Sequence, residues 1–226
     1  MMKGIITMRY PSAQSGVKKV FVAEILTLLT AVLTLVGAVV ALVGLDGEGT
    51  LSEDAVTGTI LGGGALLLVS GIAGFVAMII NLIGLHQGGK DEHGMHYAFI
   101  MAVLAIASAA AGEALTMNGK TTIGGLLTDL TGLFNFLVIA FVIASIIRLA
   151  ELLNDQRMID KGHCLSAVIL ISLLCSLIAS TLPGVFHLTL SDQLTGILAL
   201  VSALAAVLGY ILYLGFLKNA VRMLKQ

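Results

Sequence analysis

The chain alternates between long apolar runs and short polar interruptions. Reading for uncharged apolar length gives six runs, over residues 20–45, 56–85, 97–117, 123–147, 164–182 and 193–217. Each is near or above the about 20 residues that a helix needs to cross a bilayer core of ~30 Å. Backbone groups in lipid must be satisfied internally, and these continuous runs lack the alternation of barrel strands. The pattern therefore predicts an all-α integral membrane protein with six transmembrane helices.

A short pattern recurs where the second, fourth and sixth runs end. It reads L-x-x-L-x-[N/Q]-x-x-[R/K] and gives Gln87, Asn154 and Asn219 equivalent positions. A glycine also precedes each odd run, at Gly16, Gly94 and Gly162. Internal repeats are a known architecture of membrane transport proteins. The alternative is that the matches reflect only the matched ends of antiparallel helices.

These repeats predict one membrane domain over residues 1–226, made of three tandem helical hairpins. Their boundaries are 1–93, which includes a polar N-terminal segment, 94–161 and 162–226. The first apolar run is too long for a signal-peptide core, so we expect an uncleaved membrane anchor. The closing sequence LPGV is expected to end the fifth run.

Composition and charge distribution support this interpretation and orient the chain. The chain is 58% hydrophobic and 11% charged, whereas soluble domains carry about 25% charged residues. With six crossings, every lysine and arginine except Lys120 falls on the side that holds both termini. Basic residues in short loops stay cytoplasmic. We therefore expect a multi-pass plasma-membrane protein with both termini in the cytoplasm.

Two carboxylates inside the apolar runs are the candidate functional residues. Glu113 lies about a turn from the outer end of the third run, and Asp129 lies nearly two turns inside the fourth. At 1.5 Å rise per residue both lie ~6–10 Å below the outer surface. Facing each other, they could share a proton or hold a cation, with Thr128, Thr131 and Asn135 as further oxygen ligands. The alternative is that each carboxylate faces the outer interface or caps a polar turn.

Three other charged residues are assigned structural roles. Glu24 lies one turn inside the first run, close to Lys18 and Lys19, and is expected to pair with them. Arg148 and Glu151 are spaced to pair on one helix face at i,i+3.

No motif points to catalysis. The two cysteines are eleven residues apart in one apolar run, without metal or CxxC spacing, and no nucleophile motif is present. We therefore predict no catalytic residues, no metal, no cofactor and no nucleic-acid partner. The small residues of the spans favour packing between helices, which predicts a non-enzymatic packing, assembly or regulatory unit in the lipid bilayer. Its neighbour would be a membrane-protein partner or a second copy of the chain.

The alternative function is a small transporter, or the membrane subunit of one. Glu113 and Asp129 would then contact the ion or substrate. A polar cavity lined by both carboxylates favours transport, whereas a dry core of small residues favours packing.

Overall fold

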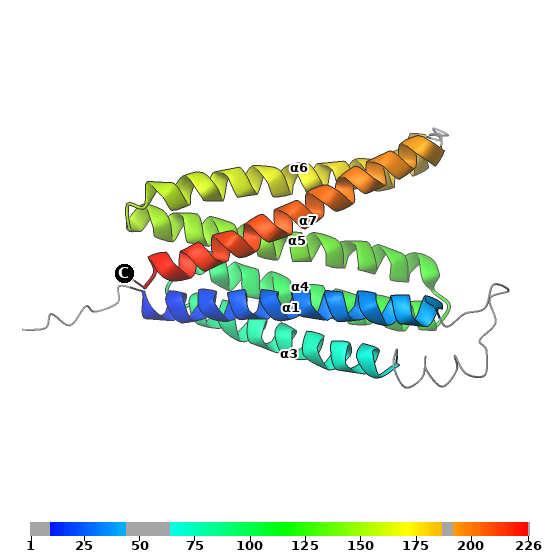
Figure 1. Ribbon diagram of the computed structural model, residues 1–226, viewed down its shortest axis with the longest axis horizontal. Helices are drawn as coiled ribbons and strands as arrows, with labels where there is room; N and C mark the ends of the chain where they lie inside the picture. Colours follow the sequence, from blue (N-terminus) through cyan, green and yellow to red (C-terminus); the bar gives the residue numbers. More distant parts are fainter. Residues whose placement is uncertain (1–9, 44–63, 187–191, 226) are drawn as a thin grey trace, which may run out of the picture.

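A computed structural model describes residues 10–43, 64–186 and 192–225 of the chain. These residues form six α-helices (Figure 1): α1 (Pro11–Val43), α3 (Gly64–Gly88), α4 (His93–Met117), α5 (Thr121–Leu152), α6 (Gln156–Phe186) and α7 (Asp192–Met223). The described part of the chain contains no strand. The prediction of an all-α protein is therefore confirmed.

Four of these helices are long and apolar enough to cross a membrane. They are α1, over Pro11–Gly37, and the whole of α3, α4 and α5. Each length exceeds the about 20 residues that a bilayer requires. These helices support a membrane-embedded protein, while six crossings stays a prediction. Gly58 and Gly62, which are among the small residues expected to favour helix packing, lie outside the described residues.

The helices are longer than the apolar runs that predicted them. The first helix begins at Pro11, well before the apolar run starts at residue 20; proline suits a first helical position because its missing N–H needs no partner there. Helix α6, which contains the fifth apolar run, continues through Pro183 to Phe186, so the prediction that LPGV ends this run near residue 182 was wrong. Lipid requires only the stretch inside the bilayer core to be uncharged, and the apolar run marks that stretch. The helix can be longer than the run, because its backbone hydrogen bonds continue into the polar interface.

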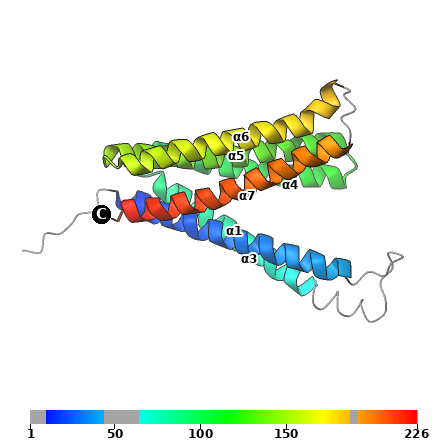
Figure 2. The ribbon, with the colours of Figure 1, turned by 45° about the horizontal axis from the view of Figure 1, so that its top comes forward.

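Consecutive helices pair as antiparallel neighbours. The most extensive contacts join α1 to α3, α4 to α5 and α6 to α7, and smaller ones join α5 to α6, α1 to α7 and α3 to α4. The start of α1, the end of α7 and the α3–α4 and α5–α6 turns gather at one end of the molecule (Figure 1). Figure 2 shows that α1 and α3 diverge from the other four helices toward the opposite end.

The buried core lies at the end where these segments gather. Five helices each contribute a fully buried side chain: Val17, Leu85, Met95, Ile146 and Leu217. Toward the opposite end, α1 and α3 instead expose large apolar side chains. A lipid environment covers such side chains without the cost of placing them in water. The core therefore holds the three helix pairs together mainly at one end.

Glycine allows the backbones of α1 and α3 to approach closely. A Cβ atom on Gly16 would lie 2.6 Å from the carbonyl oxygen of Gly84 and 2.6 Å from the amide nitrogen of Gly88. Toward the opposite end of this pair, the hydroxyls of Thr34 and Ser70 are hydrogen-bonded to each other. Small residues thus run along this helix contact, as expected for association in a membrane.

The glycines that precede the other odd runs also lie at close contacts. A Cβ on Gly94 of α4 would overlap the side chain of Ser145 on α5, and one on Gly162 of α6 would overlap that of Ile147 on α5. Each glycine that the sequence singles out therefore lies close to a neighbouring helix, through backbone atoms at Gly16 and through side-chain atoms at Gly94 and Gly162.

The pattern that closes the even runs adopts three different local structures. Gln87 lies in the last turn of α3, Asn154 lies in the turn after α5 with a φ of 55°, and Asn219 lies within α7. The leucines two positions before these residues differ too. Leu85 and Leu217 are fully buried, whereas Leu152 is 50% exposed. The hairpin repeat therefore stays a prediction.

Candidate functional site

The predicted carboxylate pair lies on α4 and α5 near the turn that joins them. The two helices are in close contact here, because a Cβ on Gly112 would lie 3.1 Å from the carbonyl oxygen of Gly124. Both Glu113 and Asp129 are exposed in the single chain. No hydrogen bond or ion pair joins them within the described residues. A shared carboxylate site at this position stays a prediction.

The other predicted oxygen ligands make local contacts or none. The hydroxyl of Thr131 donates to the carbonyl oxygen of Leu127 at 2.9 Å, and that of Thr128 donates to Gly124 at 3.1 Å. Asn135 is exposed. A hydroxyl that donates a hydrogen bond to a carbonyl oxygen of its own helix needs no other hydrogen-bond partner within the apolar run. The structure therefore brings these residues to one region without joining them in a binding cluster.

A different carboxylate makes a contact between distant helices. The hydroxyl of Tyr210 on α7 lies 2.9 Å from the Oε2 atom of Glu24 on α1 and 2.8 Å from its main-chain carbonyl oxygen. The Glu24 side chain is partly buried at this α1–α7 contact. Burying a carboxylate is costly unless it is hydrogen-bonded, so the tyrosine stabilises Glu24 at this depth and ties the first described helix to the last.

The sequence-based pairing of Glu24 with Lys18 and Lys19 was wrong. The ammonium group of Lys19 instead donates to the Oε1 atom of Gln87 at 2.8 Å, and Ser15 donates to the same oxygen at 3.1 Å. The reason is geometric, because Lys19 lies beside the end of α3 whereas Glu24 lies beside α7. One member of the repeated closing pattern therefore joins α1 to α3.

A second carboxylate, Glu92, organises the α3–α4 turn. Its side chain is only 7% exposed, and its Oε1 atom lies 3.5 Å from the amide nitrogen of Gly94, which caps the start of α4. The same oxygen accepts a hydrogen bond from Arg148 of α5 at 3.4 Å. The predicted i,i+3 pairing of Arg148 with Glu151 was therefore wrong, because the side chain reaches across to the neighbouring helix.

The same turn also caps α1. The Oδ2 atom of Asp91 accepts a hydrogen bond from the amide of Ala13 at 2.7 Å, in the first turn of that helix. A carboxylate at a helix start satisfies a free amide and complements the helix dipole. Adjacent acidic residues of one turn thus fix the starts of α1 and α4. The sequence offered only a charged loop as a signal for either contact.

These contacts form a set of polar connections between helices. Within residues 10–43, 64–186 and 192–225, no three His, Cys, Asp or Glu side chains gather closely enough to hold a metal ion. One buried acceptor, the Oδ1 atom of Asn81 in α3, has no hydrogen-bond partner among these residues. Comparison with protein-family models, curated proteins and solved structures finds no match.

Proposed function

We propose that this chain is a six-span protein of the plasma membrane that acts without catalysis, as a packing, assembly or regulatory unit. The observation that carries this proposal is the use of polar side chains between helices. Glu24 is bound by Tyr210, and Glu92 is bound by Arg148. Side chains used in this way hold the bundle together. Their use as structural connections favours a packing role over a solute pathway.

The helix pairs support the proposed hairpin organisation. Helices α1 and α3, α4 and α5, and α6 and α7 each form an antiparallel pair, which corresponds to the segments 1–93, 94–161 and 162–226. A glycine lies near the beginning of each pair, where it approaches a neighbouring helix: Gly16 and Gly94 approach the second helix of their own pair, and Gly162 approaches α5 of the preceding pair. A glycine at the start of every hairpin is a feature that a triplicated hairpin would share.

Charge supports the proposed orientation. We name the end where α1 begins and α7 ends the basic end, because every described lysine and arginine except Lys120 lies there. Lys120 lies at the α4–α5 turn, at the opposite end. Basic residues near membrane spans remain on the cytoplasmic side. Both termini would accordingly be cytoplasmic, and the neighbour in the bilayer would be a partner protein or a second copy.

Reconstitution of the purified full chain into liposomes separates this proposal from transport. We expect cation and proton flux equal to that of protein-free liposomes, both for the unmodified chain and for Asp129→Asn and Glu113→Gln. Glu151→Gln, at the basic end, is the matched control. Flux that either outer-end variant abolishes, and that the control preserves, would reject the packing role and establish transport.

The assembly role also requires a neighbour in the membrane. Counting fluorescently labelled chains by stepwise photobleaching, in membranes at native expression, measures whether copies associate. Crosslinking in the same membranes measures association with other proteins. A chain that is both single and uncrosslinked in its native membrane would contradict assembly.

A further inference from the structure

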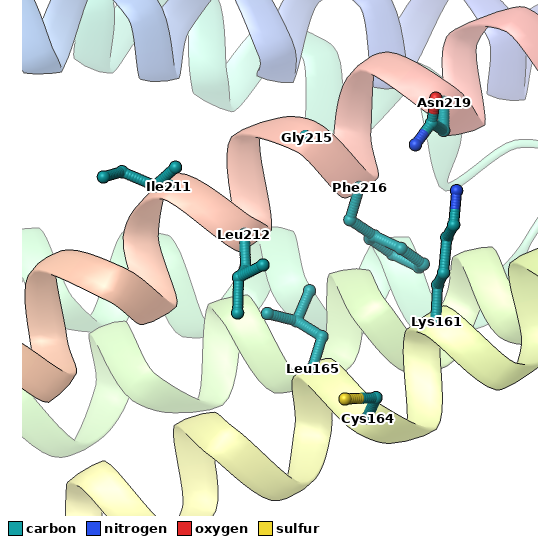
Figure 3. Close-up of a pocket in the computed structure, with 8 residues that line it drawn as sticks. All are labelled: Lys161, Cys164, Leu165, Ile211, Leu212, Gly215, Phe216 and Asn219. Carbon is teal, nitrogen blue, oxygen red and sulfur yellow. The ribbon is translucent and has the colours of Figure 1, made fainter.

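A groove between α6 and α7 has features that the proposed packing role does not use (Figure 3). It has a volume of about 260 Å³. Its lining residues are Lys161, Cys164, Leu165, Ile211, Leu212, Gly215, Phe216 and Asn219. The Lys161 ammonium and the Asn219 side chain lie at one end, while Leu165 and Leu212 point toward each other farther along (Figure 3). The groove is therefore amphipathic along its length.

The groove exists partly because Gly215 has no side chain. A Cβ at this position would meet nothing within 4 Å, and both Gly215 and Lys161 are exposed. The volume is below the about 300–1,000 Å³ of pockets that enclose a whole small ligand. The groove is thus suited to one segment of a longer molecule that continues along the surface of the helices.

The polar end of the groove has a positive environment. Arg157 lies one turn before Lys161 on α6, and Lys218 and Arg222 lie on the neighbouring part of α7. The start of α6 is capped by Asp155, whose Oδ1 atom accepts a hydrogen bond from the amide of Met158 at 3.2 Å, and Asp160 accepts one from Gln156 at 3.1 Å. The positive charge therefore comes from the four basic side chains, which outnumber these two acidic ones. In the part of the chain that the structure describes, no acidic side chain forms an ion pair with Lys161. Charge complementarity therefore calls for an anionic group.

The position of the groove across the proposed membrane indicates which class of ligand it binds. Its polar end lies at the basic end of the bundle, where the cytoplasmic interface is proposed, and its apolar end extends toward the membrane interior. Basic pockets between membrane helices on the cytoplasmic side suit anionic lipid headgroups. A phospholipid has the required order of groups, with a phosphate at the interface and an acyl chain below it.

We propose that the α6–α7 groove binds one anionic phospholipid. The phosphate accepts hydrogen bonds from Lys161 and Asn219, and one acyl chain lies against Leu165, Leu212 and Phe216. This assignment rests on the proposed membrane orientation and adds a specific ligand to it. Its test uses residues other than Glu113 and Asp129, so failure here is distinguishable from failure of the packing role.

The test is lipid retention by the purified full chain. The chain is placed in nanodiscs that contain phosphatidylglycerol and phosphatidylcholine and is then released into mild detergent. Native mass spectrometry measures the mass of the protein with the lipids that it retains. We expect one retained phosphatidylglycerol. Gly215→Leu should abolish retention by filling the groove, and Lys161→Gln should weaken it about fivefold, which corresponds to about 1 kcal/mol for one basic residue near an anionic surface.

Matched variants control for the substitutions themselves. Gly132→Leu, on α5, also introduces a side chain where a Cβ meets nothing within 4 Å, and Lys120→Gln removes a lysine from the opposite end. Both should retain the lipid. If Gly215→Leu fails to fold, the Lys161→Gln result decides alone. Equal retention of the two lipids, absence of retained lipid, or full retention by Lys161→Gln would each overturn the proposal.

Discussion

Replacing Gly16 by alanine tests the closest backbone contact in the molecule's first helix pair. The new Cβ would lie 2.6 Å from both the carbonyl oxygen of Gly84 and the amide nitrogen of Gly88, and 2.8 Å from the Cα of Gly88. All three are backbone atoms, so no side-chain rotation can relieve the overlap. Ordinary contact begins at about 3.4 Å, and α1 and α3 would have to separate by roughly 0.8 Å here.

The expected loss of stability is the difference between two effects. Overpacking a well-packed contact costs about 1–3 kcal/mol, whereas alanine gains up to about 1 kcal/mol over glycine in a helix interior. We expect Gly16→Ala to lower the free energy of unfolding by about 0–2 kcal/mol. The separation would also strain the nearby hydrogen bond between Lys19 and Gln87.

Gly71→Ala on α3 is the matched control, because a Cβ there meets nothing within 4 Å. It should gain helix propensity without a clash and leave stability unchanged or slightly raised. Unfolding both variants in mixed micelles with increasing sodium dodecyl sulfate, followed by circular dichroism, gives the two free energies. The difference between them isolates the overlap at about 1–3 kcal/mol. Equal stabilities would refute the close backbone approach.

Three further predictions concern the polar connections and the orientation. Tyr210→Phe should lower the free energy of unfolding by about 1–3 kcal/mol, because it removes the hydroxyl that donates to the partly buried carboxylate of Glu24. Glu92→Gln should cost about 1 kcal/mol by weakening the contact with Arg148 and the cap of α4; the same detergent titration measures both. Reporter enzymes fused after Asp155 should report the cytoplasm, and those fused after Gly119 should report the outside.

Each of these predictions has a control or a contradicting result. Tyr97→Phe alters an exposed tyrosine and should be neutral, so equal losses for both tyrosine variants would remove the role assigned to the α1–α7 contact. Glu151→Gln should also be neutral, and a loss larger than that of Glu92→Gln would restore the i,i+3 pair. Outside activity from the Asp155 fusion would reverse the orientation.

The sequence by itself determined the helical class and the approximate position of every described helix. Uncharged length and the absence of alternation are local properties, and lipid leaves few backbone solutions for such runs. The ends were less well determined, as the early start of α1 and the passage of α6 through Pro183 show. Local sequence also singled out Gly16, Gly94 and Gly162, which the structure places at close helix contacts.

Only the tertiary structure decided which side chains meet. Glu24 was assigned to nearby lysines, but its partner Tyr210 is 186 residues away. Arg148 was assigned to its own helix face, yet it contacts Glu92, 56 residues earlier. Glu113 and Asp129 were identified by residue type and by distance from the ends of their apolar runs, whereas the direction of each side chain around its helix depends on the packing of α4 against α5.

The physical reason is that a sequence gives depth along a membrane helix more readily than direction around it. In water, an amphipathic helix marks its buried face by the period of its apolar residues. A helix in lipid is apolar on most sides, so that signal is weak, and only the packing of neighbouring helices fixes which way a polar side chain points. Tyr210 shows the consequence: within an apolar run its sequence context does not identify it as the partner of a carboxylate on α1.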